Sequence, residues 1–119
     1  LSAVSDEELP YGRIVRKSDG SFSHIVEDKD CTPEEKAIRE LNVGVYVFES
    51  GPLWEAIDQL RPINAQGEYY LTDAPAYILS RGGRVGACPT CTAEEMLGVN
   101  TVEQLAQVEE LVRRREGLK

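Results

Sequence analysis

The sequence lacks features that would indicate a membrane or a nucleic-acid partner. Its 119 residues contain no apolar run near the roughly 20 residues needed to cross a bilayer, and no charged-then-apolar leader. Cations are in the minority, because 13 Lys and Arg stand against 21 Asp and Glu. A surface that neutralises phosphates needs clustered cations. We therefore expect no nucleic acid and no membrane among its partners.

Cysteine and histidine are also scarce, with 3 Cys and 1 His. An odd number of cysteines leaves one thiol unpaired in any intramolecular disulfide scheme, which favours a reducing compartment and a cytoplasmic location. Cys88 and Cys91 have a spacing that can clamp a metal or form a disulfide. However, Cys31 and His24 lie far away in sequence, so we interpret these cysteines as structural or incidental thiols.

The length and the hydrophobic periodicity predict one small α/β unit, residues 1–119, with strands and helices mixed along the chain. Strand patterns are expected at 1–4, 13–16, 22–27, 42–48 and 84–88. Helical patterns are expected at 33–40, 53–60, 74–79, 93–97 and from 102 to the basic run 113–115. Capping residues precede three helices: Thr32, Thr72 and Thr101. The largely apolar stretch 42–48 predicts a strand buried on both faces at the centre of the sheet.

Polar chemistry is densest between residues 64 and 73, Asn-Ala-Gln-Gly-Glu-Tyr-Tyr-Leu-Thr-Asp. Amide, hydroxyl and carboxylate groups there can donate to and accept from a hydroxyl-rich ligand, and tyrosine rings offer it an apolar floor. A sugar is the ligand that this pattern favours. The alternative is an ordinary loop that ends in a helix cap at Thr72.

The same stretch resembles a segment of bacterial N-acetylglucosamine-1-phosphate uridyltransferases, the pyrophosphorylase part of the bifunctional enzyme that makes UDP-N-acetylglucosamine for cell wall peptidoglycan. Four further segments resemble motifs of that family in the same order: residues 11–16, 25–30, 40–46 and 98–100. The resemblance runs from about residue 10 to about residue 115. It implies a Rossmann-like nucleotidyltransferase domain with a mixed sheet flanked by helices.

Five residues match positions that bind the sugar nucleotide in the family: Gly12, Glu27, Asn42, Tyr70 and Thr72. Glu27 would accept hydrogen bonds from the sugar, and Gly12 would let the backbone approach it closely. Glu68 and Tyr69 are expected to support the loop, and Lys29 is a weaker binding candidate. Without the resemblance, each of these residues has an ordinary structural interpretation as a turn, strand end or solvated charge.

Asn100 matches an asparagine that shares magnesium with an aspartate from the preceding half of the family's domain. Magnesium prefers oxygen ligands and keeps several waters, so one amide oxygen cannot hold the ion alone. The alternative is that Asn100 belongs to a turn that leads into a capped helix.

Nucleotidyl transfer requires a glycine-rich loop for the triphosphate and a carboxylate for magnesium, and no such loop occurs in the sequence. The resemblance assigns both to an absent amino-terminal half, and it places a β-helix acetyltransferase domain beyond the chain. We expect a sugar-binding half that binds UDP-N-acetylglucosamine or N-acetylglucosamine 1-phosphate, with no catalytic residue and no turnover alone. The alternatives are a fragment of another sugar-phosphate nucleotidyltransferase and a non-catalytic module that self-associates into a homo-oligomer.

Overall fold

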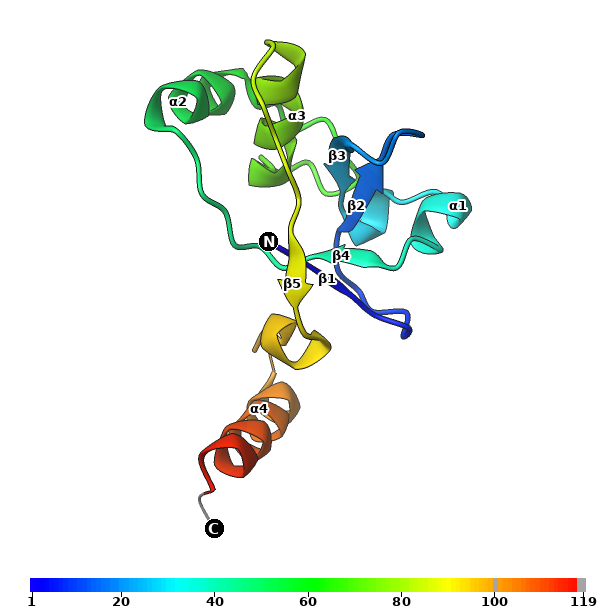
Figure 1. Ribbon diagram of the computed structural model, residues 1–119, viewed down its shortest axis with the longest axis vertical. Helices are drawn as coiled ribbons and strands as arrows, with labels where there is room; N and C mark the ends of the chain where they lie inside the picture. The colour runs from blue at the N-terminus through cyan, green and yellow to red at the C-terminus, as the bar shows by residue number, and fades with distance from the viewer. Residues whose placement is uncertain (100, 118–119) are drawn as a thin grey trace.

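Residues 1–99 and 101–117, which the computed structural model describes, form a mixed five-stranded sheet with helices around it (Figure 1). The strand order is β3-β2-β4-β1-β5. The strands are β1 (Ser2–Val4), β2 (Arg13–Arg16), β3 (Phe22–Val26), β4 (Glu40–Asn42) and β5 (Pro89–Cys91). The helices are α1 (Pro33–Lys36), α2 (Ser50–Gln59), α3 (Ala74–Ser80) and α4 (Val102–Glu116), with 3-10 turns at Asp28–Asp30, Leu71–Asp73 and Ala93–Met96.

The predicted α/β class is confirmed, and the sheet is mixed because β1 pairs parallel with β5 and antiparallel with β4. The strands β2 and β3 form the predicted hairpin, in which Ile14 pairs with Ile25. Its turn contains Gly20 at φ 82°, a conformation that glycine adopts without strain. The Asp19 carboxylate accepts the backbone N–H of Ser21 at 2.8 Å, which closes the turn.

The strand expected at 42–48 is wrong, because the central strand is Glu40–Asn42 and shares only Asn42 with that range. β4 occupies the middle of the sheet and ends at Asn42, whose side-chain Oδ1 accepts the backbone N–H of Gly44 at 3.2 Å. Gly44 has φ 80°, so the chain turns there and leaves the sheet. Val47 beyond this turn is fully exposed. The apolar run was therefore misleading, because the turn at Gly44 removes its second half from the sheet.

Two other expectations need correction. α1 has the predicted capping box between Thr32 and Glu35 but ends at Lys36, because Glu40 already belongs to β4. The strand expected at 84–88 is absent from this described segment, and β5 begins at Pro89 instead. Val85 and Ala87 pack against the core, and the carbonyl of Cys88 accepts the backbone N–H of Ser2 at 2.9 Å.

Three apolar clusters form the core. The first contains Ala3, Leu41 and Met96, the second contains Ile14, Phe22 and Ile25, and the third contains Ala56, Leu60 and Ala74. The third cluster joins α2 to α3, and the first two lie against the sheet. The helices predicted at 53–60 and 74–79 are confirmed as α2 and α3, with ends that differ by up to three residues. The helical turn predicted at 93–97 is the 3-10 helix Ala93–Met96.

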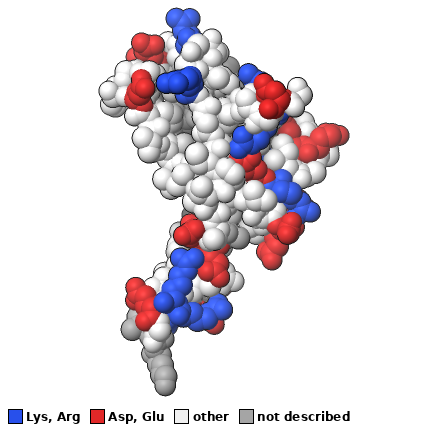
Figure 2. Space-filling model, in the orientation of Figure 1, with Lys and Arg blue, Asp and Glu red and all other residues white. Residues whose placement is uncertain are grey.

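Helix α4 has the predicted capping box of Thr101 with Gln104 and extends away from the sheet (Figure 1). Its expected apolar face stays largely uncovered, since Val102 is 78% exposed and Leu105 is 52% exposed. The basic residues 113–115 occupy its last turn, where cations complement the helix dipole. Arg113 pairs with Glu109 at 2.7 Å and Arg115 pairs with Glu94 at 3.2 Å. Figure 2 shows basic and acidic groups intermixed at this end of the molecule. No helix among the described residues is long and apolar enough to span a membrane.

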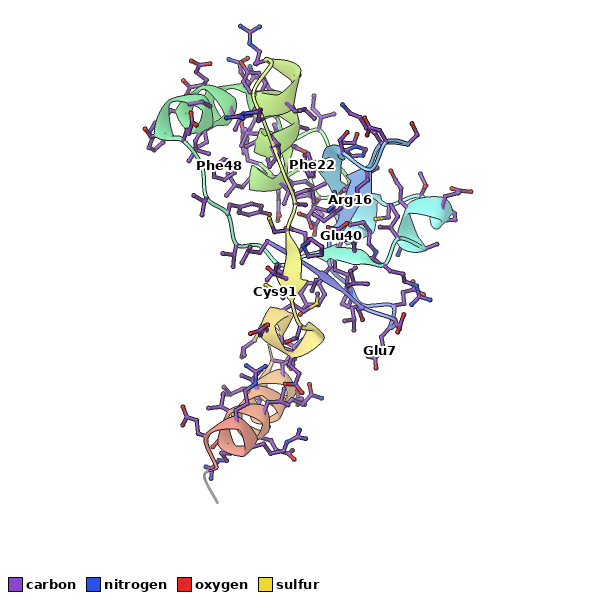
Figure 3. The ribbon with its side chains drawn as sticks, in the orientation of Figure 1. Glu7, Arg16, Phe22, Glu40, Phe48 and Cys91 are labelled. Carbon is purple, nitrogen blue, oxygen red and sulfur yellow. The ribbon has the colours of Figure 1, made fainter. Side chains whose placement is uncertain are left out.

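An ion pair that the sequence did not suggest connects the sheet to the segment before β5. Arg16 on β2 donates from Nε and Nη2 to both carboxylate oxygens of Glu40 on β4, at 2.6 and 2.7 Å (Figure 3). Ser2 on β1 donates its hydroxyl to the same carboxylate at 2.7 Å. Arg16 also donates to the carbonyl of Ala87 at 3.1 Å. The ion pair of Arg16 and Glu40 therefore connects β1, β2, β4 and the segment before β5.

Candidate functional site

Glu27 and Thr72 form the centre of the candidate site. Glu27 directly follows β3, and Thr72 lies in the 3-10 turn Leu71–Asp73. The Thr72 hydroxyl donates to Glu27 Oε1 at 2.8 Å, and Thr72 is buried. Thr72 does not cap α3, because the residue at the N-cap position is Asp73 and no side chain caps this end. The cap predicted at Thr72 is therefore wrong, and its hydroxyl serves the carboxylate instead.

Gly12 lies directly beside this carboxylate. A Cβ atom at Gly12 would be 3.3 Å from Glu27 Oε2 and 3.2 Å from the carbonyl oxygen of Val26. The carbonyl of Gly12 accepts the backbone N–H of Asn42 at 2.8 Å. Gly12 thus brings the end of β4 next to the end of β3, and a side chain at position 12 would crowd Glu27 Oε2.

Asn42 is buried at the end of β4, and two donors hold its side-chain oxygen. Oδ1 accepts the backbone N–H of Gly44 at 3.2 Å and the hydroxyl of Tyr46 at 3.0 Å. Burial raises the pKa of Tyr46, and the charge of Glu27 raises it further. Our sequence interpretation missed Tyr46. Its place four residues after Asn42, within the segment 40–46 that resembles a family motif, was the available signal.

Tyr70 joins the site through a chain of side-chain hydrogen bonds. Gln66 donates from Nε2 to the Tyr70 hydroxyl at 2.7 Å and accepts at Oε1 from Lys29 Nζ at 2.5 Å. The backbone N–H of Ala65 donates to Asp30 at 2.7 Å. Burial raises the pKa of the Tyr70 hydroxyl, and the negative charges of Asp30 and Glu27 act in the same direction. The hydrogen bonds from Lys29 to Gln66 and from Ala65 to Asp30 attach the loop to the 3-10 turn Asp28–Asp30.

The loop itself is organised by Asn64. Its Oδ1 accepts the backbone N–H groups of Gln66 at 3.1 Å and of Glu68 at 3.2 Å, and its Nδ2 donates to the Glu68 carbonyl at 2.5 Å. The side chains of Glu68 and Tyr69, which we expected to support the loop, are exposed. That expectation is corrected: the supporting side chains are Asn64 and Gln66.

A buried arginine anchors the turn that follows Glu27. Arg13 is 1% exposed, and its Nη1 lies 3.4 Å from Asp28 Oδ1. The same nitrogen donates to the carbonyl of Tyr11. Arg13 lies on β2 beside Gly12, so the ion pair fixes the turn relative to the glycine. The position of Glu27 therefore depends on the buried charge of Arg13. The sequence of this strand did not indicate that Arg13 is buried.

The predicted magnesium ligand Asn100 lies outside the described residues. Within residues 1–99 and 101–117, no group of three His, Cys, Asp or Glu side chains could hold a metal ion. Cys31, Cys88 and Cys91 are free thiols. Burial raises the pKa of Cys31, which favours the less reactive thiol form. The described residues do not by themselves form a magnesium site.

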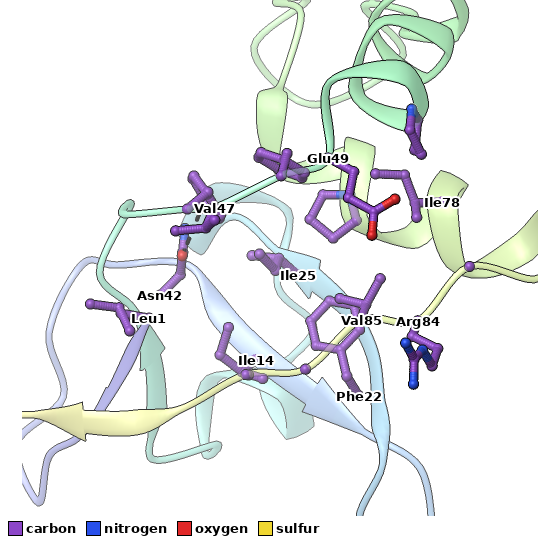
Figure 4. Close-up of a pocket in the computed structure, with 17 residues that line it drawn as sticks. Leu1, Ile14, Phe22, Ile25, Asn42, Val47, Glu49, Ile78, Arg84 and Val85 are labelled. Atoms are coloured by element: carbon purple, nitrogen blue, oxygen red, sulfur yellow. Dashed lines mark hydrogen bonds between the residues drawn. The ribbon is translucent and has the colours of Figure 1, made fainter.

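A cavity of about 410 Å³ opens beside the polar cluster, between the sheet and α3 (Figure 4). Its lining is mostly apolar and includes the core residues Ile14, Phe22 and Ile25. Asn42 and Tyr46 are the polar-cluster residues that reach it. We interpret the cavity as an open part of the hydrophobic core, because Glu27, Tyr70 and Thr72 lie outside its lining.

Four of the five predicted binding residues thus come together through direct contacts or one intermediate group: Gly12, Glu27, Asn42 and Thr72. Tyr70 lies two residues from Thr72, and its pKa responds to the charge of Glu27. The cluster offers the carboxylate of Glu27, and it offers the amide of Asn42 hydrogen-bonded to the phenol of Tyr46. Such a set suits a ligand that has several hydroxyl groups.

Nearly the whole chain aligns with curated proteins. Over 115 residues, 97% of the chain, it is 45% identical to the "Bifunctional protein GlmU" of Pelotomaculum thermopropionicum. The chain is similar to part of GlmU. GlmU of Clostridium beijerinckii is 47% identical over 118 residues, 99% of the chain, and GlmU of Solibacter usitatus is 43% identical over 116 residues, 98% of the chain.

The chain spans about a quarter of the length of these GlmU proteins, namely 25% of the first and third and 26% of the second. Such coverage is consistent with similarity to one segment of a GlmU protein. No protein-family model matches the chain.

Proposed function

We propose that this chain is the sugar-nucleotide-binding portion of a uridyltransferase that forms UDP-N-acetylglucosamine and pyrophosphate from UTP and N-acetylglucosamine 1-phosphate. The convergence of Glu27 and Thr72, which are 45 residues apart in sequence, carries the proposal. The similarity to GlmU proteins, which are named as bifunctional, supports it. So does the resemblance of the 64–73 stretch to the family segment.

Each residue of the cluster has a role in the proposed binding. Glu27 Oε2 accepts from a sugar hydroxyl, because Oε1 is already occupied by Thr72. Asn42 contacts a further polar group of the sugar, and Tyr70 borders the ring. Gly12 leaves room beside the carboxylate, since any side chain there would meet Glu27 Oε2. We place this binding in the cytoplasm, where sugar nucleotides for peptidoglycan are made.

In the complete reaction, a phosphate oxygen of the sugar phosphate attacks the α-phosphorus of UTP and pyrophosphate leaves. This chain would orient the sugar phosphate for that attack, and a nucleotide-binding half outside the chain would hold UTP. Magnesium, when bound, offsets the charge of the phosphates. Asn100 would contribute one amide oxygen to it, together with an aspartate outside the chain. The chain alone is then a binding unit without turnover.

Two measurements on the purified 119-residue chain test the proposal. Titration with UDP-N-acetylglucosamine, followed by amide NMR shifts, should perturb residues around Glu27 and Thr72, and Glu27→Gln should weaken binding. The control Glu55→Gln changes an exposed carboxylate on α2 and should leave binding unchanged. Pyrophosphate formation should be absent with UTP, N-acetylglucosamine 1-phosphate and magnesium. Turnover by the chain alone, or no shifts at millimolar ligand, contradicts the proposal.

A competition panel separates this function from that of another sugar-phosphate nucleotidyltransferase. UDP-N-acetylglucosamine should displace a bound reporter sugar nucleotide more effectively than UDP-glucose, dTDP-glucose or ADP-glucose. A stronger effect of one of the other nucleotides would assign the chain to that alternative class.

A second candidate function is a non-catalytic module that self-associates. The segment after Gly44 favours it, because Val47 is fully exposed and Val45 is 51% exposed. Exposed apolar side chains invite association. Sedimentation equilibrium distinguishes the two functions. A monomer that binds the sugar nucleotide supports the first, and a dimer that dissociates in Val45→Ser and Val47→Ser variants without sugar binding supports the second.

A further inference from the structure

The side-chain amide of Asn42 has a defined orientation. Two hydrogen-bond donors, the backbone N–H of Gly44 and the hydroxyl of Tyr46, point at the same side-chain atom. Only the amide oxygen can accept from both, because the amide nitrogen is a donor. The NH2 group must therefore face the other way. It makes no hydrogen bond within residues 1–99 and 101–117, so its hydrogen-bonding capacity is unused there.

Tyr46 is itself held in place. Its ring is partly buried, lies with its centroid 5.6 Å from that of Phe48, and borders the cavity beside β4. Burial and the charge of Glu27 raise the pKa of its hydroxyl, so the hydroxyl is protonated at neutral pH. A protonated phenol can donate to Asn42, whereas a phenolate could not. The Tyr46 hydroxyl therefore donates to the amide oxygen of Asn42 at neutral pH.

The orientation of the Asn42 amide determines which hydrogen-bonding groups the site offers together with the carboxylate of Glu27. Glu27 accepts hydrogen bonds only, and both Glu27 and Asn42 flank Gly12. With the observed orientation, Glu27 contributes an acceptor to the site and the Asn42 side chain contributes a donor. With the amide reversed, it would present two acceptors, and only ligand groups that donate could meet both of them.

We propose that Tyr46 is a positioning residue that directs the Asn42 NH2 group toward an acceptor oxygen of the sugar. Tyr46 does not itself contact the ligand. The inference rests on the proposed function, because it assumes that Asn42 meets a sugar. It also specifies the direction of the hydrogen bond. The sugar atom that meets Asn42 is an acceptor, such as a hydroxyl or carbonyl oxygen, and the sugar group that meets Glu27 is a donor.

A double-mutant cycle tests the proposal. Tyr46→Phe keeps the ring and removes the hydroxyl, and it should weaken binding of UDP-N-acetylglucosamine by about three- to ten-fold, the range expected for one hydrogen bond. In an Asn42→Ala background, the same change should have no further effect. The matched control Tyr77→Phe alters a partly buried tyrosine on α3, away from the cluster, and should leave binding unchanged. Equal weakening in both backgrounds would overturn the inference.

A second measurement needs no ligand and separates the two proposals. The side-chain NH2 signals of Asn42, identified by their loss in Asn42→Ala, should shift or broaden in Tyr46→Phe and stay in place in Tyr77→Phe. If Tyr46→Phe leaves them unchanged, the positioning contact is refuted whether or not the chain binds sugar. If they move but the wild-type chain does not bind, the contact is supported and the proposed function fails.

Discussion

The hydroxyl of Thr72 donates to the carboxylate of Glu27 at 2.8 Å, across 45 residues of sequence. This bond joins the 3-10 turn before α3 to the end of β3. It also occupies one carboxylate oxygen, so that the second is directed toward Gly12. The site is thus organised by a contact between two segments that the chain brings together only on folding.

Replacing Thr72 by valine should test this bond directly. Thr72→Val keeps the shape of the side chain and leaves the partly buried carboxylate without its donor, so we expect a loss of about 1–2 kcal/mol in the free energy of unfolding. Urea denaturation measures it. Thr90→Val, at an exposed position on β5, is the control and should change the stability by less than about 0.5 kcal/mol. Equal stability of the two variants would contradict the assignment.

Gly12→Ala should reduce both stability and sugar binding. The new methyl group would lie 3.2 Å from the Val26 carbonyl and 3.3 Å from Glu27 Oε2, which is tight for a Cβ contact. We expect a loss of about 1 kcal/mol in stability and displacement of the carboxylate. Gly51→Ala near the start of α2 meets nothing within 4 Å and should be neutral or slightly stabilising. Thermal unfolding and NMR titration of both variants provide the comparison.

The pair of Arg16 and Glu40 predicts how stability depends on pH. Burial alone would raise the pKa of Glu40, but the hydrogen bonds from Arg16 and Ser2 lower it below its ordinary value of 4.5. Because the folded pKa is the lower one, the stabilisation is complete above pH 4.5 and is lost as pH falls through the folded pKa. Glu40→Gln should flatten this part of the curve and cost about 1 kcal/mol at pH 7, a figure reduced for solvent screening.

Urea denaturation at several pH values between 7 and 3 measures this dependence. Glu55→Gln, at an exposed position on α2, serves as the control and should retain the wild-type curve. If Glu40→Gln loses stability at acid pH as the wild type does, the carboxylate of Glu40 does not cause the pH dependence.

Asn64→Ala should loosen the loop at 64–70 without unfolding the sheet. The variant loses two bonds to the backbone N–H groups of Gln66 and Glu68 and one to the Glu68 carbonyl. We expect amide exchange at these two residues to accelerate about ten-fold or more, in line with the loss of one to two hydrogen bonds. Hydrogen exchange by NMR measures it. Unchanged exchange, or acceleration equal to that in the exposed variant Glu68→Gln, would refute the supporting role of Asn64.

Local patterns predicted much of the fold. The capping boxes at Thr32 and Thr101, the hairpin between β2 and β3, and the helices after Pro52 and Ala74 are all confirmed. These features depend on hydrogen bonds between residues a few positions apart or on the alternation of neighbouring side chains. The sequence also contains the residues of the candidate site, and their binding of a sugar remains a prediction.

The tertiary structure decided what local patterns could not. Thr72 had the composition of a helix cap, but the carboxylate of Glu27 lies within reach of its hydroxyl and takes the bond. The apolar run after Asn42 had the composition of a buried strand, but Gly44 turns the chain out of the sheet. The sequence by itself determined which turns, caps and chemical groups exist, because these need only near neighbours. The meeting of Glu27, Thr72, Gly12 and Asn42 required the packing of segments distant in sequence, and only the folded chain supplies it.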